Sequence, residues 1–298
     1  MINKSNTKRR EVLKKMVFTS MGLPLIDQIK LYNSNQNNYY YQINMKGNLN
    51  HSVCKWCYGQ ISLEEFSLLV KSMGIKGIDL IGPEEWPILK KYGLTSSMCN
   101  GAEISLTEGW NDKQYHSTLV DSYLKHIDLV ADAGYTNLIC FSGNRRAIDD
   151  EKGMGNCVEG LKKILGYAEK KGVIIQMELL NSKVDHQDYM CDNSPWGFEL
   201  CRRIDSSNFK LLYDIYHMQI NEGDVIRTIT ENQQFIGHYH TGGVPGRNEI
   251  DQTQELFYPA IMKAIVSTCF KGFVAQEFIP KNNNPIQSLE NAIRICDV

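Results

Sequence analysis

Four polar residues interrupt apolar segments at the points where strands would end. Glu178 lies in "VIIQMEL", Asp214 in "FKLLYDI", His240 in "FIGHYHT" and Glu277 in "FVAQEFI". Two glutamates, one aspartate and one imidazole form a donor set suited to Mn²⁺, Mg²⁺ or Co²⁺, and also to Zn²⁺. Three carboxylates packed together without a cation would repel one another and take up protons. One divalent metal ion is therefore the simplest account of the set.

These side chains must be brought together by the elements that carry them. Short apolar runs alternate with longer helical patterns from residue 50 onward, and the candidate strands are 51–56, 76–81, 94–99, 136–142, 173–179, 209–215, 235–241 and 273–279. Helical spacing is clear over 114–134 and 156–172, and both segments end in glycine. Eight strands alternating with helices over about 250 residues predict a (β/α)8 TIM barrel. A doubly wound sheet is the alternative, but no glycine-rich phosphate loop follows any strand.

In a barrel of this kind, functional side chains gather at the carboxyl ends of the strands. Because side chains alternate along a strand, His238 and His240 share one face of the seventh strand. We expect Glu178, Asp214, His240 and Glu277 to point inward at about the same height. A single acid at a strand end is more commonly a helix cap, and a single histidine is more commonly part of the core. Four such residues on the last four strands indicate a site.

Several segments carry a resemblance to a known family. "MELLN", "YDIYHMQINEGD", "IGHYHTGGVPGRNEIDQTQELFYPAIM" and "GFVAQEFIP" resemble the hydroxypyruvate isomerase and ketose 3-epimerase branch of the xylose isomerase-like TIM barrels. The resemblance covers most of residues 50–298 and is strongest from residue 173 onward. "PGRNE" after a GHxH strand, together with DxYH, is typical of the hydroxypyruvate isomerase-like group.

The resemblance implies a role for each matching residue. Glu178, Asp214, His240 and Glu277 would hold one divalent metal, and the two glutamates would also act as the acid/base pair. His217 and Arg247 would contact substrate oxygens. Hydroxypyruvate isomerases often carry Gln at the position of His240, where this chain and the epimerases have His, so the substrate stays open.

The chemistry implied is isomerisation or epimerisation of a small ketose or hydroxy-carbonyl compound. It proceeds by proton transfer through a metal-stabilised enediolate, with one carboxylate taking the α proton and another returning it. The alternative is a metal-dependent lyase or hydrolase acting on an oxidised (3-keto) glycoside. Phosphodiester cleavage would need further His/Asp ligands and a basic face, which the sequence lacks. A sugar-binding barrel without catalysis would have no need of paired glutamates.

Other residues after the strands are weaker candidates. Trp56 and Arg145 are candidate substrate contacts, although a core role for Trp56 and a surface role for Arg145 are the alternatives. The polar segment 181–197 is either a lid that carries Trp196 over the substrate or a solvated loop whose Trp packs on the barrel.

Composition narrows the class of protein. The 298 residues are 42% hydrophobic and 22% charged, with a net charge of -2 and a pI near 6.4. These values are typical of a soluble globular protein and argue against a nucleic-acid partner or stable membrane insertion. The partner expected is a small-molecule carbohydrate, and homo-oligomerisation stays open.

The nine cysteines include "CKWC" at 54–57, which we interpret as structural because no second ligand pair accompanies it.

Residues 1–45 differ from the rest of the chain. "KRREVLK" at 8–14 precedes the apolar "MVFTSMGLPLI" and resembles a twin-arginine export signal, and a polar linker, "NSNQNNYYYQ", follows. The expected organisation is a signal and linker over 1–45 and a xylose isomerase-like barrel over 46–298. Export in the folded state would place the protein in the periplasm. If the segment is instead a basic amphipathic helix, the protein would stay in the cytoplasm.

Overall fold

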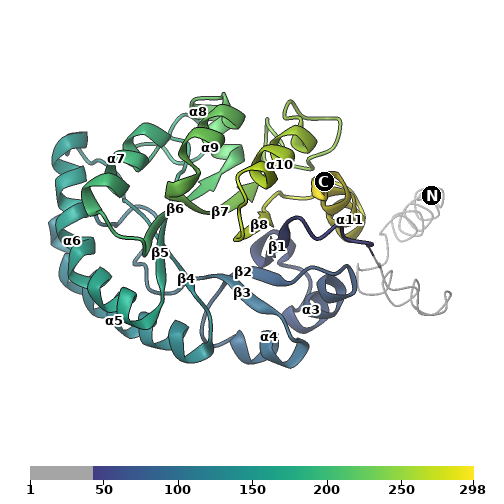
Figure 1. Ribbon diagram of the computed structural model, residues 1–298, viewed down its shortest axis with the longest axis horizontal. Coiled ribbons are helices and arrows are strands. Elements are labelled where there is room, and N and C mark those ends of the chain that lie inside the picture. The colour runs from purple at the N-terminus through teal and green to yellow at the C-terminus, as the bar shows by residue number, and fades with distance from the viewer. Residues whose placement is uncertain (1–42) are drawn as a thin grey trace, which may run out of the picture. The chain divides into compact units, whose positions relative to one another are not determined.

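Eight parallel strands close into a barrel in the computed structural model, which describes residues 43–298 (Figure 1). The strands follow one another around the barrel in chain order, and the last pairs with the first. They are β1 (Asn50–Cys54), β2 (Gly77–Ile81), β3 (Thr95–Cys99), β4 (Asn137–Cys140), β5 (Ile174–Glu178), β6 (Phe209–Asp214), β7 (Ile236–Thr241) and β8 (Phe273–Gln276). The predicted (β/α)8 TIM barrel is confirmed.

Helices connect the strands and surround them in Figure 1. They are η1 (Lys55–Tyr58), α3 (Leu63–Ser72), α4 (Trp86–Tyr92), η2 (Lys113–Tyr115), α5 (His116–Ala133), α6 (Asp150–Lys171), α7 (Ser194–Ile204), α8 (Ile215–Asn221), α9 (Val225–Asn232), η3 (Gln233–Phe235), α10 (Tyr258–Ser267) and α11 (Pro285–Cys296). The predicted glycine signals are confirmed: Gly134 and Gly172 cap α5 and α6 with φ of +78° and +70°. Glycine adopts this left-handed conformation without a Cβ clash.

Most predicted boundaries are off by one or more residues, and three of the differences bear on the site or have a clear cause. The first strand ends at Cys54, so Trp56 lies in η1 and not on the strand. The sixth strand ends at Asp214, because Asp214 caps a short helix, α8, that begins at the next residue. Helix α6 begins at Asp150, six residues earlier than predicted, because the Asp149 side chain accepts a hydrogen bond from the Lys152 amide. The first turn of α6 is polar, so the sequence shows no helical spacing of apolar residues there.

The long connections all lie beyond the carboxyl ends of the strands. Segments 100–112, 141–149, 179–193, 242–257 and 277–284 follow β3, β4, β5, β7 and β8. The returns to the next strand are short, as at 73–76, 134–136 and 205–208. One end of the barrel therefore has the chain length to build a pocket, and this is the end where functional groups gather in the fold.

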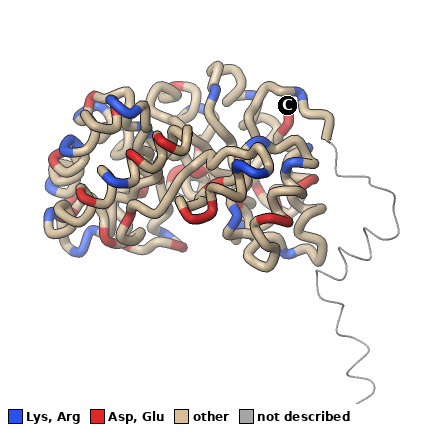
Figure 2. Tube along the Cα trace, turned by 90° about the horizontal axis from the view of Figure 1, so that it is seen from below, with Lys and Arg blue, Asp and Glu red and all other residues tan. Residues whose placement is uncertain are grey.

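The predicted signal and linker at 1–45 fall almost wholly outside the described residues, and export stays a prediction. Within residues 43–298, no helix is both long enough and apolar enough to cross a bilayer. Figure 2 shows acidic and basic positions intermixed over this part of the chain. All nine cysteines are free, including Cys54 and Cys57.

Candidate active site

Four predicted ligand residues come together at the carboxyl end of the barrel. Glu178, Asp214 and His240 lie at the ends of β5, β6 and β7, and Glu277 directly follows β8. Each is buried, with 5% or less of its surface exposed. Asp214 and His240 are register partners of adjacent strands. One donor atom from each of the four lies within 4.8 Å of the other three, so one small cation would reach them all.

Asp214 uses its two carboxylate oxygens differently. Oδ1 accepts hydrogen bonds from the backbone amides of Tyr216 (2.8 Å) and His217 (3.2 Å), which makes Asp214 the cap of α8. Oδ2 faces the interior, 3.2 Å from a guanidinium nitrogen of Arg247. Capping fixes the side-chain rotamer, so the second oxygen is held toward the cluster.

The imidazole of His240 supplies the clearest sign that a cation fits here. Its Nδ1 lies 2.8 Å from Glu277 Oε2 and 3.2 Å from Glu178 Oε1. Even so, this nitrogen is buried and forms no hydrogen bond of acceptable geometry among the described residues. A ring nitrogen and carboxylate oxygens that converge without a hydrogen bond between them match the oxygen-rich, one-imidazole donor set of a divalent metal. The residues present therefore fit such an ion.

Two side chains donate hydrogen bonds to the carboxylate of Glu277. Trp56 Nε1 donates to Glu277 Oε1 at 2.8 Å, and a guanidinium nitrogen of Arg247 donates to Oε2. The Arg247 guanidinium also lies between two aromatic rings, 5.3 Å from the centroids of Trp56 and Tyr216. The family resemblance suggested Arg247 as a substrate contact. The structure places Arg247 at the pocket wall, where its guanidinium already pairs with Glu277 and Asp214.

The carboxyl groups differ in their affinity for protons. Burial, together with the nearby carboxylates Glu277 and Glu178, outweighs Arg247 and raises the pKa of Asp214 to about 7. Burial acts in the same direction on Glu277, but Arg247 and His240 outweigh it and hold the pKa of Glu277 well below its usual range. Glu277 is therefore ionised near neutral pH, while Asp214 is near its midpoint in the metal-free protein.

His217 lies in the first turn of α8 and is fully buried. Asn181 Nδ2 donates to its Nδ1 at 2.6 Å, so the ring proton is on Nε2. Burial, aided by Arg247, lowers the pKa of His217 well below its usual value and keeps the ring neutral. Within the described residues Nε2 has no hydrogen-bond partner and lies 3.6 Å from Asp214 Oδ2. It is a donor that a substrate oxygen would satisfy.

A pocket of about 420 Å³ opens beside the cluster. Its walls come from η1, the segment after β5, α8 and the segments after β7 and β8, and its lining residues are Trp56, Val184, Asp185, His186, Tyr216, Ile220, Val244, Pro245, Gly246, Arg247 and Ile279. The sequence reading missed Asn181, Asp185 and His186. The run "NSKVDH" directly after "MELL" was the available signal, since polar residues follow a ligand-bearing strand there.

Two weaker candidates lie elsewhere. Arg145 pairs with Asp150 (2.6 Å) and Asp192 (3.1 Å) and also donates to the backbone carbonyls of Tyr189 and Met190. It ties the segment after β4 to the segment after β5, and it does not line the pocket. Trp196 is 7% exposed in the first turn of α7, so of the two alternatives for this segment the structure supports the one in which the Trp packs on the barrel.

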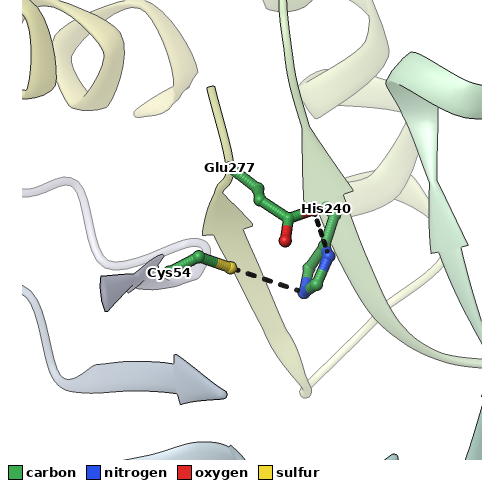
Figure 3. Close-up of side chains that lie close together, drawn as sticks. All are labelled: Cys54, His240 and Glu277. Atoms are coloured by element: carbon green, nitrogen blue, oxygen red, sulfur yellow. Dashed lines mark hydrogen bonds and ion pairs between the residues drawn. The ribbon is translucent and has the colours of Figure 1, made fainter. Parts of the chain in front are cut away.

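Cys54 lies closer to the site than its structural interpretation suggested. Figure 3 shows Cys54 and Glu277 facing different nitrogens of the His240 ring. Cys54 Sγ is 3.8 Å from Nε2, whereas Glu277 faces Nδ1. Burial raises the pKa of the Cys54 thiol well above its usual range, with Glu277 acting in the same direction, so the sulfur carries its proton.

Comparisons with known proteins agree with the barrel fold. The family model described as the xylose isomerase-like TIM barrel matches residues 69–296. The 2-oxo-tetronate isomerase of Cupriavidus necator is 31% identical over 124 residues, which cover 42% of this chain and 47% of that protein. The hydroxypyruvate isomerase of Escherichia coli K12 is 28% identical over 149 residues, which cover 50% of this chain and 57% of that protein.

The matched segments thus span about half the length of these curated relatives. Among solved structures, the 3-keto-D-glucoside 4-epimerase of Escherichia coli superposes with a TM-score of 0.68. The match covers 83% of this chain and 100% of that chain, at 16% sequence identity. A likeness at this identity shows the fold alone.

Proposed function

The chain belongs to the xylose isomerase-like TIM barrel family, and from this premise we propose that it is a divalent-metal-dependent isomerase or epimerase. Its substrate would be a small ketose or hydroxy-carbonyl compound. The relatives named as 2-oxo-tetronate isomerase and hydroxypyruvate isomerase support this reaction class. The buried acidic cluster at the carboxyl end of the barrel supports the metal dependence.

One observation carries the proposal. Glu178 and Glu277 come from β5 and the end of β8, and both face the same nitrogen of His240, at 3.2 and 2.8 Å. Two carboxylates that approach one centre from different strands suit an exchange of protons on two sides of a carbon. A binding protein would need only one of them to hold a cation or a hydroxyl group.

Glu178, Asp214, His240 and Glu277 would hold the ion. When bound, a divalent cation supplies Lewis-acid polarisation of a carbonyl and neutralises negative charge that develops on its oxygen. Mn²⁺ and Mg²⁺ suit this oxygen-rich set best, with Co²⁺ or Zn²⁺ as alternatives.

The chain's own groups would divide the remaining work. Glu277 is ionised near neutral pH and would take the proton α to the carbonyl, and Glu178 would return a proton from the other side. His217 Nε2 would donate to a substrate oxygen, because it is a buried donor without a partner in the described residues. Arg247 and Trp56 would orient the substrate at the pocket wall.

The pocket volume of about 420 Å³ lies within the range of roughly 300–1,000 Å³ typical of small-molecule sites. The exposed indole of Trp56 offers an apolar face on which a sugar ring can pack. This indole favours a ketose over hydroxypyruvate.

The test is a substrate panel in deuterated water with Mn²⁺ or Mg²⁺ present. Ketoses, 2-oxo-tetronate, hydroxypyruvate and a 3-keto-glucoside are incubated with the protein, and products and deuterium incorporation are read by NMR. We expect deuterium at the carbon next to the carbonyl of one substrate, with loss of turnover on chelation. Turnover that persists fully after removal of all metal would refute the proposal.

A second candidate is a lyase or hydrolase on an oxidised glycoside. The size of the pocket, which leaves room for a glycoside, favours testing it. In the same panel, a lyase or hydrolase releases a second product from the 3-keto-glucoside, whereas an epimerase returns a single isomer.

A further inference from the structure

Asp79 is a fully buried carboxylate behind the proposed metal ligands, and no step above uses it. It lies at the middle of β2, and its side chain reaches across the barrel to β7. Oδ2 lies 2.5 Å from His238 Nε2 and 3.2 Å from His240 Nε2, while Oδ1 accepts a hydrogen bond from the Ser97 hydroxyl.

The backbone around Asp79 is irregular in a way that directs this side chain. The register between β2 and β3 shifts both before and after Asp79, and the next residue, Leu80, has a φ of +59°. Bulges of this kind change the direction of a side chain next to active sites. Gly77 leaves the space that Ser97 occupies, since a Cβ at Gly77 would lie 2.5 Å from the Ser97 hydroxyl oxygen.

The contacts determine which nitrogen of His240 carries the proton. Oδ2 of Asp79 faces ring nitrogens of both His238 and His240 and accepts from them, so the His240 nitrogen that faces Asp79 is the donor. Cys54 faces the same nitrogen at 3.8 Å, on the left in Figure 3, but a protonated thiol is the weaker acceptor. With the proton on Nε2, the lone pair of His240 is on Nδ1, the nitrogen that faces Glu178 and Glu277.

We propose that Asp79 is a positioning residue, which holds the His240 ring by Nε2 so that Nδ1 is presented to the metal. The inference rests on the proposed metal-dependent function. A ligating histidine commonly donates its second N–H to such a carboxylate, which raises the basicity of the ligand and fixes its orientation. In this chain β2 supplies this carboxylate, whereas the four proposed ligands lie at the ends of β5, β6 and β7 and directly after β8.

The substitution Asp79→Asn tests this on the full barrel. We expect the affinity for Mn²⁺, measured by titration calorimetry on metal-stripped protein, to fall by about 10- to 100-fold. The control is Asp297→Asn, which changes a second buried aspartate that pairs with a histidine, His51, at 3.5 Å. His51 is near the start of β1, away from the site, and the affinity of this variant should match wild type. Equal Mn²⁺ affinity in folded Asp79→Asn and wild-type protein would overturn the proposal.

A measurement on the wild-type protein does not depend on the folding of the variant. In ¹⁵N-histidine-labelled protein loaded with diamagnetic Zn²⁺, the His240 shifts should identify Nε2 as protonated and Nδ1 as the coordinating nitrogen. Coordination through Nε2 would overturn the proposal outright. Neither readout uses a substrate, so a protein that passes both and turns over no member of the panel refutes only the isomerase or epimerase function. A wild-type protein that bound no Mn²⁺ would refute the metal centre and both proposals.

Discussion

The exposed indole of Trp56 donates a hydrogen bond of 2.8 Å to the buried carboxylate of Glu277. Trp56 is 46% exposed, whereas Glu277 is 2% exposed. The two residues are 221 positions apart in the chain and meet because β1 and β8 close the barrel. Closure of the barrel thus places a neutral donor against one of the two proposed proton-transfer groups.

The substitution Trp56→Phe should lower turnover by about 10- to 100-fold, since a hydrogen bond to a charged group contributes about 1.5–3 kcal/mol. Trp56 helps to hold the pKa of Glu277 low, so its removal raises that pKa. At saturating Mn²⁺, the acidic limb of the pH–rate profile, which then reports protonation of Glu277, should move to higher pH. Trp196→Phe is the matched control and should leave the profile unchanged. An unshifted limb in Trp56→Phe would mean that Glu277 is not the titrating base.

Glu178→Gln and Glu277→Gln should each reduce turnover by about 10²- to 10⁴-fold, the usual contribution of a positioned acid or base. Metal content, measured on purified protein by mass spectrometry, should change much less because the amide oxygen can still coordinate. Glu169→Gln, at a surface position that accepts from Ser206, is the control for the substitution itself. Near-normal rates in both site variants would rule out a two-base mechanism.

Asp214→Asn should lose metal while keeping the helix cap. The Asn side-chain oxygen can still accept from the Tyr216 amide, but no carboxylate then faces the cluster. Mn²⁺ affinity should fall by more than about 100-fold, a larger loss than expected for an outer partner of a ligand. Asp214→Ala should lose the cap as well, at a further cost of about 1 kcal/mol in unfolding free energy. Unaltered metal content in Asp214→Asn would contradict the ligand assignment.

Metal affinity should depend on pH in a direction set by Asp214. Its pKa is raised to about 7 in the metal-free protein, and a ligand carboxyl must lose its proton before it coordinates. Mn²⁺ affinity should therefore fall about tenfold per unit as the pH drops below about 7. Calorimetry in two buffers of different ionisation enthalpy should detect one more proton released at pH 6 than at pH 8. A flat affinity over this range would show that Asp214 is ionised throughout.

The same shift affects the stability of the metal-free protein. The folded form retains a proton that the unfolded chain, with an Asp pKa of 3.8, has already lost. The contribution of Asp214 to stability is therefore full below about pH 4 and declines as the pH rises toward 7. Mn²⁺ should reverse this decline in a thermal melt, and Asp214→Asn should not show it.

Arg145→Gln should affect stability more than catalysis. Its guanidinium holds two carboxylates and two backbone carbonyls, so its removal should cost about 1–3 kcal/mol of unfolding free energy. In a domain of this size each kcal/mol lowers the melting temperature by about 2–4 °C. Arg202→Gln, on the exposed face of α7, is the control. A large rise in KM with unchanged melting temperature would restore Arg145 as a substrate contact.

The fold was predictable from the sequence because the spacing of apolar residues is a local property of each segment. Apolar spacing within a window of about 10–20 residues identifies each strand and helix. The order of the strands around a TIM barrel then follows from the alternation of strands and helices along the chain. The four cluster residues were predictable for the same reason, since each ends or follows a strand. The predicted element boundaries were wrong where a side-chain hydrogen bond starts a helix. Asp214 and Asp149 cap helices in this way, although the apolar pattern gives no sign of it.

The supporting residues were not predictable because their partners are distant in sequence. Asp79 meets His238 and His240 across about half the chain, and Asn181 reaches His217 over 36 positions. Arg145 was a candidate substrate contact because it follows a strand, yet nearby carboxylates and carbonyls hold it away from the pocket. Such pairings depend on which distant segments meet in the folded chain, and local apolar spacing does not predict this.

Trp56 also gives the protein an intrinsic optical reporter. The chain has four tryptophans, and the other three, Trp86, Trp110 and Trp196, are between 0% and 7% exposed. An added aqueous quencher would therefore reach Trp56 far more readily than these three. Because Trp56 lines the pocket and touches Glu277, fluorescence and its quenching would follow occupancy of this site in the unlabelled enzyme, including ligands that are bound but never turned over.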